Sequence, residues 1–315
     1  SEGDSGNVDG FGGHANKETS TGNIFRGCRA WNNGDDGFDL INCYASYIIE
    51  YCWSFRNGYK PHSIESSGGN GAGFKSGGYG MGDIKKVPNP IPQHTVRYCL
   101  AYYNRQQGFY SNHHLGGLIF ENNTAYKNPS NYNMLNRKSS NEAVDVPGYG
   151  HIIKNNLSLS PRNSGGFPQH LINVDNTLSE IKNNSFAPND LNLSESDFES
   201  LNEQELMGSR KSDGSLPDIN FLRLTNHANF RFSGMGCFIN EEAVDYSWIQ
   251  EPAIVLENGV ARIVGEDSKS FNKFYVNGEE VSIENGIVDL TSMSGELNLK
   301  AISENGAVTT LIINK

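Results

Sequence analysis

The chain has 315 residues, which is long enough for one large domain and a smaller one, each with its own core. Its formal net charge of −11 argues against a general role in binding nucleic acid or an anionic membrane surface. The 35 glycines indicate many turns, whereas 14 tyrosines and 16 phenylalanines argue against disorder. No apolar run approaches about 20 residues, so no membrane-spanning helix is predicted.

Residues 1–190 contain a repeated pattern in which a short alternating apolar stretch ends in asparagine. Clear copies are Phe25–Asn33, Ile49–Asn57, Val96–Asn104 and Phe120–Asn128, and degraded copies are Ile153–Ser158 and Ile181–Phe186. A period near 24 residues with alternating apolar positions is typical of a right-handed parallel β-helix, whose coils each carry about three short strands. We therefore predict an all-β protein with a parallel β-helix over residues 1–190.

Stacking these coils predicts one column of small polar and thiol side chains. The column contains Cys28, Cys52, Cys99, Asn123, Asn156 and Asn184. We interpret it as a structural ladder, with thiols packed inside and asparagine amides bonded to the neighbouring coil, rather than as glycosylation sites. Five cysteines without metal-type spacing also argue against a complete disulfide framework.

Four aspartates beside glycines and phenylalanines stand out in this background. They lie in Val8-Asp9-Gly10-Phe11 and in Asn33-Gly34-Asp35-Asp36-Gly37-Phe38-Asp39. Asp9 precedes Asp35 by about one coil and is expected to stack beneath it. Calcium takes roughly six to eight oxygen ligands in irregular geometry, so Asp9, Asp35, Asp36 and Asp39 predict a Ca²⁺ site. The alternative is that aspartate and glycine merely favour turns here.

A long interval between two of the cysteines draws attention to Lys75. Cys52 and Cys99 are separated by about two repeats, and the interval holds a Gly-, Ser- and Pro-rich excursion from Lys60 to Pro92. Long loops of a solenoid gather on its ligand-binding face, so Lys75 is predicted to lie near a groove. Most lysines are solvated surface charges, but a cation nearby would lower the pKa of Lys75, as a base requires.

The repeats stop near residue 190. Residues 191–248 are predicted to form a capping and return segment with a short helix. Residues 249–315 contain short alternating runs separated by turn signals at Glu257-Asn258-Gly259, Val276-Asn277-Gly278, Glu284-Asn285-Gly286 and Glu304-Asn305-Gly306. This spacing predicts a small antiparallel β-sandwich in which no residue is expected to be catalytic.

Several of these motifs resemble those of polysaccharide lyase family 9. The resemblance rests on Asn7–Phe11, Gly27–Leu40 and Gly71–Gly78, continues through Gln107–Phe109 and Gly116–Tyr126, and reaches Ser215–Pro217. It covers about residues 5 to 235 and not the C-terminal module. The family contains calcium-dependent pectate lyases and rhamnogalacturonan lyases built on a parallel β-helix.

The resemblance implies roles for the matching positions. Asp9, Asp35, Asp36 and Asp39 correspond to calcium ligands, and Lys75 corresponds to the Brønsted base. The implied reaction is β-elimination on an acidic pectic polysaccharide: calcium binds a galacturonate carboxylate, neutral Lys75 removes the C5 proton, and the bond to the C4 oxygen breaks. The product carries a 4,5-unsaturated uronate end. Such a substrate implies a secreted, periplasmic or cell-surface protein.

Two departures from the family pattern lie close to the expected groove. They are Ser76, directly after the lysine, and the run from Tyr110 to His114. An aromatic and histidine-bearing wall would suit a deoxy sugar such as rhamnose, although neutral drift in loop residues explains the departures as well. The predicted substrate contacts are Lys60, Arg105, Tyr110, His113 and His114.

Two other classes of function stay open at this point. A β-helix glycoside hydrolase would need a pair of carboxylates at hydrolase spacing. A non-catalytic pectin-binding solenoid would keep the repeats without needing Lys75. Asp9, a ligand candidate, lies close to the first residue, whereas a β-helix needs earlier coils or a cap to cover its apolar N-terminal end. We therefore also expect earlier coils, an N-terminal segment or another chain to complete the β-helix.

Overall fold

The computed structural model describes residues 7–79, 87–162, 168–186, 191–239, 252–257, 259–264, 268–284, 286–304 and 306–315. The chain divides into two compact units. The first comprises residues 1–195, 202–221 and 235–239, and the second comprises residues 196–201, 222–234 and 240–315. The predicted capping segment contributes to both units. Residues 1–6, where a further N-terminal segment would attach, lie outside the described residues.

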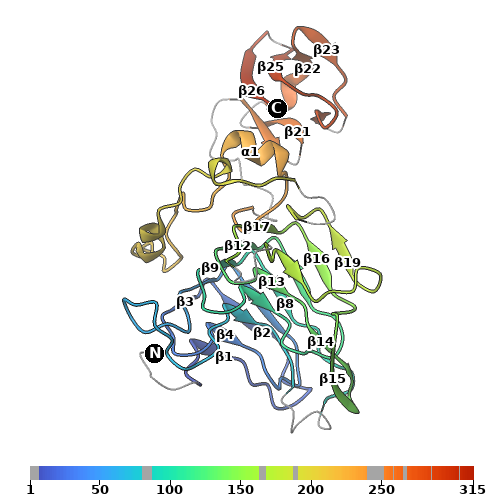
Figure 1. The fold of residues 1–315 in the computed structure, drawn as a ribbon. Coiled ribbons are helices and arrows are strands. Elements are labelled where there is room, and N and C mark those ends of the chain that lie inside the picture. The colour runs from blue at the N-terminus through green and yellow to red at the C-terminus, as the bar shows by residue number, and fades with distance from the viewer. Residues whose placement is uncertain are drawn as a thin grey trace. The chain divides into compact units, whose positions relative to one another are not determined.

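The first unit is a parallel β-helix whose coils contribute short strands to three sheets (Figure 1). The first sheet contains β1 (Phe11–Gly12), β4 (Phe38–Asp39), β7 (Phe74–Lys75), β10 (Phe109–Tyr110), β13 (Tyr132–Asn133) and β18 (Leu171–Ile172). The second contains β2 (Asn23–Arg26), β5 (Tyr47–Glu50), β8 (Thr95–Arg97), β11 (Ile119–Glu121), β16 (Ile152–Lys154) and β19 (Glu180–Lys182). The third contains β3 (Arg29–Trp31), β6 (Trp53–Phe55), β9 (Leu100–Tyr102), β12 (Thr124–Tyr126) and β17 (Leu157–Leu159). The predicted parallel β-helix is confirmed.

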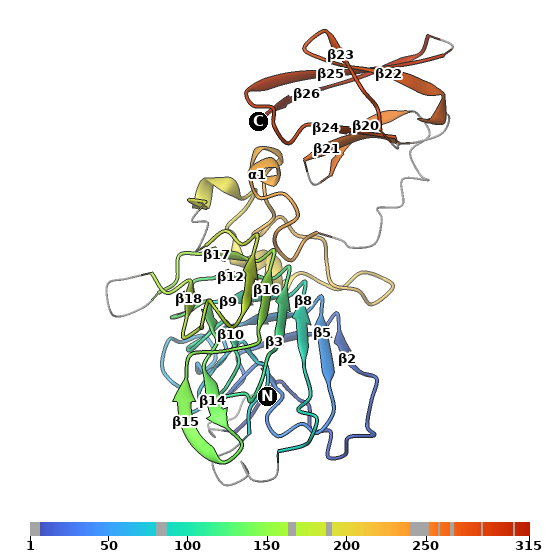
Figure 2. The ribbon, with the colours of Figure 1, turned by 90° about the vertical axis from the view of Figure 1, so that its right-hand side faces the viewer.

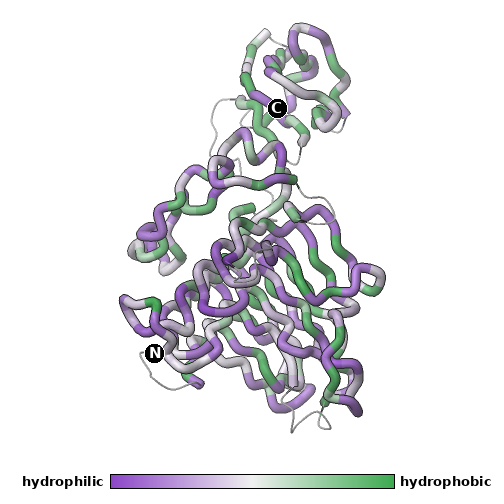
Figure 3. The backbone as a smooth tube through the Cα atoms, viewed as in Figure 1, coloured by the Kyte–Doolittle hydropathy of each residue, from purple (hydrophilic) through white to green (hydrophobic). Residues whose placement is uncertain are grey.

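A column of aromatic rings forms the inner side of the first sheet. Its members are Phe11, Phe38, Phe74, Phe109 and Tyr132, and each ring stacks on the next at 4.9 to 5.0 Å between centroids. Figure 3 shows apolar, green stretches on several coils of the β-helix. Because successive side chains of a strand point to opposite faces, Asp39, Lys75 and Tyr110 lie on the outer side of the same strands.

Two ladders of polar side chains tie the coils together inside the β-helix. The predicted ladder is confirmed: the backbone amide of Cys99 donates to Asn123 Oδ1 at 3.0 Å, and the Asn123 and Asn156 side chains donate to the next asparagine at 3.1 and 2.9 Å. The sequence analysis missed a second ladder, formed by Asn33, Asn57, Asn104, Asn128 and Asn131, with side-chain hydrogen bonds of 2.7 to 3.0 Å. None of the five cysteines, all of which lie among the described residues, forms a disulfide bond.

The region around Lys75 is more regular than the predicted excursion. Phe74 and Lys75 form β7, which pairs with β4 on one side and β10 on the other. The additional residues of this coil lie on either side of β7, between β6 and β7 and between β7 and β8. Lys75 therefore projects from a sheet and not from a loop.

Further segments of the first unit lie against or extend from the coils. An antiparallel hairpin follows β13 and consists of β14 (Asn136–Ser139) and β15 (Glu142–Val146). Residues 202–221 include a 3₁₀ helix, Glu203–Met207, which is held to the third sheet by an ion pair of 2.6 Å between Arg56 and Glu203. Arg29 donates to the carbonyl oxygen of Leu206 at 2.6 Å.

The second unit carries short helices and antiparallel sheets. Its helices are α1 (Asn226–Arg231), with Thr225 as N-cap, and a 3₁₀ turn at Ser268–Ser270. A further 3₁₀ turn, Glu195–Asp197, contains the point in the chain where the first unit ends and the second begins. The sheets (Figure 2) are β20 (Ala253–Glu257), β21 (Val260–Val264) and β24 (Ile287–Asp289), and β23 (Glu279–Val281), β22 (Phe271–Val276), β25 (Glu296–Ser303) and β26 (Val308–Asn314).

The hairpin between β22 and β23 illustrates why this module is antiparallel. Its turn residues Asn277 and Gly278 have φ angles of +52° and +88°, as a tight hairpin turn with the native strand twist requires. The predicted antiparallel module is confirmed. Among the described residues of the whole chain, no helix is both long enough and apolar enough to cross a membrane.

Replacing Phe74 tests the importance of the aromatic column. The fully buried Phe74 ring lies between two stacked rings, so we expect Phe74→Ala to lower the free energy of unfolding by about 3 to 5 kcal/mol, and Phe74→Leu by about 1 kcal/mol. Urea denaturation followed by tryptophan fluorescence measures this, because Trp31 and Trp53 lie in the β-helix. Ile312→Ala, at a side chain that is 63% exposed, is the control that should change little. Equal stability of Phe74→Ala and the wild type would contradict the expectation.

Candidate active site

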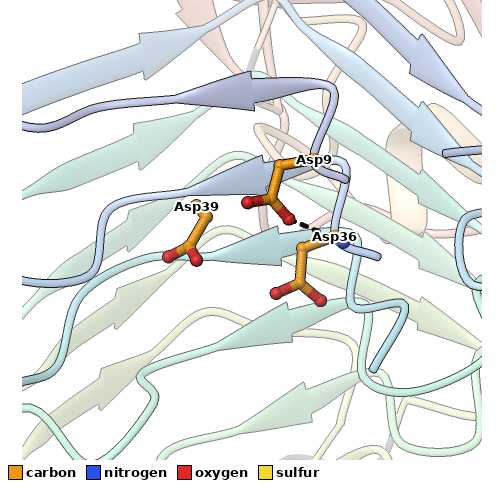
Figure 4. Close-up of side chains that lie close together, drawn as sticks. All are labelled: Asp9, Asp36 and Asp39. Atoms are coloured by element: carbon orange, nitrogen blue, oxygen red, sulfur yellow. Dashed lines mark hydrogen bonds between the residues drawn. The ribbon is translucent and has the colours of Figure 1, made fainter. Parts of the chain in front are cut away.

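Three carboxylates from two successive coils come together beside the first sheet. One carboxylate oxygen each of Asp9, Asp36 and Asp39 lies within 4.8 Å of the others (Figure 4). Asp36 and Asp39 are buried, and Asp9 is half-buried. The backbone amide of Asp36 donates to Asp9 Oδ1 at 2.9 Å, the dashed line of Figure 4. The structure thus brings together three of the four predicted metal ligands.

Strand register decides which carboxylates meet. Phe11 pairs with Phe38 and Gly12 with Asp39, so Asp9 is level with Asp36. The prediction that Asp9 stacks beneath Asp35 is therefore wrong by one residue. A glycine is needed between these coils, because a Cβ atom at Gly10 would lie 2.6 Å from the carbonyl oxygen of Gly37. The close approach of the two backbones allows the carboxylates to meet.

Asp35 instead accepts hydrogen bonds from the neighbouring loop. Its Oδ1 atom accepts hydrogen bonds from the backbone amides of Asn70 at 2.5 Å and Gly71 at 3.4 Å. Asp35 is outside the group of three, and its predicted part in binding a metal stays a prediction.

Lys75 lies against this group on the adjacent strand. Its register partner is Asp39, and Lys75 Nζ lies 2.9 Å from Asp39 Oδ2 and 3.1 Å from Asp36 Oδ2. The side chain is only 11% exposed. Burial disfavours the ammonium form, but the attraction of Asp36 and Asp39 outweighs it and raises the pKa of Lys75 above its usual range. Its pairing with Asp36 and Asp39 therefore favours the ammonium form of Lys75.

The carboxylates carry more negative charge than Lys75 can neutralise. Burial, only partly offset by Lys75 and reinforced by Asp35 and Asp39, raises the pKa of Asp36 to about 7. Burial and the charge of Asp39 also raise the pKa of Asp9. The Asp36 Oδ2 atom is buried and is ion-paired with Lys75 Nζ at 3.1 Å, and Asp39 shares the same ammonium. Three clustered carboxylates beside a single ammonium are a set of oxygen ligands that fits a hard cation such as Ca²⁺.

A pocket of about 290 Å³ opens beside Lys75. It is lined by Asp36, Lys75, Tyr110 and His113, and by Asn70, Ala72, Gln106, Gln107 and Asn112. The four amide side chains were not among the predicted substrate contacts, because polar residues in loops have no sequence spacing that indicates a binding role. Such amides can donate to and accept from sugar hydroxyl groups.

Two of the five predicted substrate contacts lie in this pocket, namely Tyr110 and His113. Lys60 and Arg105 do not line it: Lys60 lies 3.5 Å from Glu65, and Arg105 donates to the carbonyl oxygen of Gly69 at 2.9 Å. The prediction for His114 is not retained, because its side chain is fully buried and both ring nitrogens are engaged. The Gly78 amide donates to Nδ1 at 3.1 Å, and Nε2 lies 3.0 Å from the carbonyl oxygen of Pro92.

The fold and the site together define a parallel β-helix protein with a group of acidic side chains and a lysine at one pocket. A family model described as "Pel9A-like, right handed beta helix region" matches residues 1–185, and one described as "Rhamnogalacturonan lyase-like, C-terminal" matches residues 175–310. The chain belongs to the Pel9A-like right-handed β-helix family. The predicted resemblance to pectate and rhamnogalacturonan lyases is thereby confirmed, but its predicted end near residue 235 is wrong, because the second match extends through the C-terminal module to residue 310.

Similar proteins carry lyase names. Pectate lyase L of Dickeya chrysanthemi is 35% identical over 240 residues, which is 76% of this chain and 48% of that protein. A solved rhamnogalacturonan lyase is 53% identical with a TM-score of 0.67, covering 74% of this chain and 56% of that one. The crystal structure of pectate lyase Pel9A is 33% identical with a TM-score of 0.56, covering 76% and 51%. The chain spans about half the length of the curated relatives it matches.

Calcium binding can be measured independently of any activity. We expect Ca²⁺ at about 100 times its dissociation constant to stabilise the protein by about 2.7 kcal/mol, seen as a rise in the thermal unfolding temperature. Asp36→Asn should abolish most of this rise, because Asp36 is the most buried member of the group. Asp218→Asn, at a side chain that is 83% exposed, is the matched control and should keep the full rise. The same rise in Asp36→Asn as in the wild type would contradict the assignment.

Proposed function

We propose that this chain carries the catalytic site of a calcium-dependent polysaccharide lyase. The proposed substrate is the galacturonate-containing backbone of pectin, either rhamnogalacturonan I or polygalacturonate, and the proposed reaction is β-elimination. The family membership and the lyase names of similar proteins support this class of reaction. A pectic substrate is in turn consistent with a secreted, periplasmic or cell-surface location.

The observation that carries the proposal is the position of Lys75. Its amine lies at a pocket wall, on the same outer face as the carboxylates, and is held by two of them. A base for the C5 proton of a galacturonate needs this placement, with little exposure to water and direct access to a bound sugar. A lysine that served only the β-helix would have no reason to face the pocket.

Lys75 must be neutral to accept a proton, and the charges around it explain how it becomes so. The attraction of Asp36 and Asp39 keeps Lys75 protonated, whereas burial acts in the opposite direction and is the larger single influence. Neutralising the carboxylates removes this attraction. Burial is then the dominant influence, and it lowers the pKa of Lys75. Two of the three carboxylates that would hold a cation, Asp36 and Asp39, thus also influence the protonation state of Lys75.

In this mechanism Asp9, Asp36 and Asp39 would hold Ca²⁺. When bound, Ca²⁺ would neutralise the uronate carboxylate of the substrate and acidify its C5 proton. Lys75 Nζ accepts that proton, the electron pair forms the C4–C5 double bond, and the bond from C4 to the glycosidic oxygen breaks. The amides of Asn70, Gln106 and Asn112, which line the pocket, would bind sugar hydroxyl groups.

The pocket gives little support to glycoside hydrolysis. Hydrolases of the usual type need two carboxyl groups separated by about 5 to 9.5 Å across the sugar. Among the described residues that line the pocket, Asp36 alone is acidic, and it is paired with Lys75. A non-catalytic binding solenoid would leave the buried Lys75 without a role.

The reaction is tested by its product. We expect the wild type with Ca²⁺ to release unsaturated uronate from rhamnogalacturonan I or polygalacturonate, measured by ultraviolet absorbance of the new double bond, and a chelator to stop it. Lys75→Gln should lower the rate by about 100-fold or more, because it removes the base. Lys211→Gln, at an exposed lysine, is the control. Saturated products, or an unchanged rate in Lys75→Gln, would overturn the proposal.

A further inference from the structure

A chain of hydrogen bonds leads away from the pocket on the side of Tyr110. The Tyr110 hydroxyl lies 3.0 Å from His113 Nε2, and His113 Nδ1 lies 2.7 Å from Asp145 Oδ1. Arg137 Nη1 lies 2.5 Å from the same Asp145 oxygen. Tyr110 and His113 line the pocket, so the chain joins the site of reaction to Asp145, whose side chain is 43% exposed.

Strand register places the first residue of this hydrogen-bond chain beside Lys75. Tyr110 is the register partner of Lys75 on the next coil, and both side chains reach the same pocket. Asn112 and His113 have φ angles of +54° and +57°, a backbone conformation that non-glycine residues rarely adopt, and Asn112 is fixed by a 2.8 Å hydrogen bond to the carbonyl oxygen of Gly77. This turn directs the His113 ring back toward Tyr110.

The other end of the chain is supplied by the β14–β15 hairpin. Asp145 and Arg137 are directly opposite each other in the antiparallel pair, and their ion pair holds the carboxylate in place. The hairpin thus supplies the partner of His113 at 2.7 Å. The hairpin therefore has a use at the pocket beyond the packing of the β-helix.

Hydrogen-bond chemistry limits the roles within the chain. An ionised carboxylate only accepts hydrogen bonds, so His113 Nδ1 carries the hydrogen that Asp145 accepts. Nε2 faces the Tyr110 hydroxyl at 3.0 Å and can either accept the phenolic hydrogen or, when Nε2 also carries a hydrogen, donate to the phenolic oxygen. The second arrangement leaves the phenolic hydrogen available for donation into the pocket. Burial and the nearby Asp145 raise the pKa of Tyr110 to about 12, so the phenol retains that hydrogen at neutral pH.

We propose, on the basis of the lyase function above, that Tyr110 is the general acid that protonates the departing glycosidic oxygen, and that His113 and Asp145 are positioning residues that orient Tyr110 and restore its proton. No other phenol lines the described pocket, and Lys75 is committed to accepting the C5 proton. Asp36 is paired with Lys75, and the ring nitrogens of His113 face Tyr110 and Asp145. An alkoxide leaving group needs such a proton far more than a phenoxide does.

The proton inventory of this step balances. Lys75 Nζ gains the C5 proton, the electron pair of the C5–H bond forms the C4–C5 double bond, and the pair of the broken C4–O bond stays on the departing oxygen. That oxygen takes the Tyr110 proton and becomes a hydroxyl, while His113 Nε2 returns a proton to the phenolate. Solvent then carries a proton from Lys75 to His113, so the enzyme ends unchanged.

The test compares two leaving groups in the full chain with Ca²⁺. One substrate is the natural polysaccharide, and the other is a galacturonide with a nitrophenoxy group at C4, which departs without protonation. For Tyr110→Phe we expect a loss of about 100-fold or more in kcat on the polysaccharide and a rate within about three-fold of the wild type on the nitrophenyl substrate. Asp145→Asn should show the same selectivity with a smaller loss, and Lys75→Gln should lose activity on both substrates.

Controls separate this role from a structural one. Tyr275→Phe removes a phenol that bonds Glu280 in the C-terminal module and should leave both rates unchanged. Tyr110→Phe and Asp145→Asn should keep the wild-type rise in unfolding temperature with Ca²⁺. An equal loss on both substrates in Tyr110→Phe, or no loss on the polysaccharide, would overturn the assignment. Failure of the wild type to form unsaturated product from either substrate would instead count against the lyase function itself.

Discussion

The stacking of successive coils in register on the first sheet is the constraint on which the rest of the structure depends. Inside, it places Phe38, Phe74 and Phe109 in a continuous column of rings about 5 Å apart. Because strand side chains alternate, the same register places Asp39, Lys75 and Tyr110 in a second column outside. A shift of one residue in any coil would bury the charges and expose the rings, so the apolar core and the reactive groups are specified together.

This arrangement concentrates opposing charges where water is scarce. Three carboxylates and one ammonium share a small volume, and the single positive charge of Lys75 is not enough to neutralise the three carboxylates. Burial of unbalanced charge destabilises the folded protein unless a partner is supplied. A bound cation would supply it, and would at the same time release Lys75 from its ion pairs. In this account, stability, metal affinity and basicity are three consequences of one electrostatic imbalance.

Sequence reasoning reached the parts of this arrangement that follow a period. The repeat near 24 residues predicted the β-helix, and the Asp-Gly motifs in that frame predicted the acidic group. It missed the ladder from Asn33 to Asn131, although asparagine ended each repeat, because the same residue type also marks turns. The partner of Asp9 was misplaced by one residue, since strand register and not repeat length decides pairing. The contact between Asp145 and His113 could not be predicted from the repeat, because the hairpin that brings Asp145 to His113 interrupts it.

The most direct measurement of the central claim is the pH titration of the Lys75 amine by NMR of lysine labelled at Cε, with the signal assigned by its absence in Lys75→Gln. The account predicts a pKa above the usual lysine range without calcium, and a clear fall on addition of Ca²⁺, because the cation takes over Asp36 and Asp39. A pKa that is unchanged by saturating Ca²⁺, in protein shown to bind the ion, would contradict the link between the carboxylate group and the base.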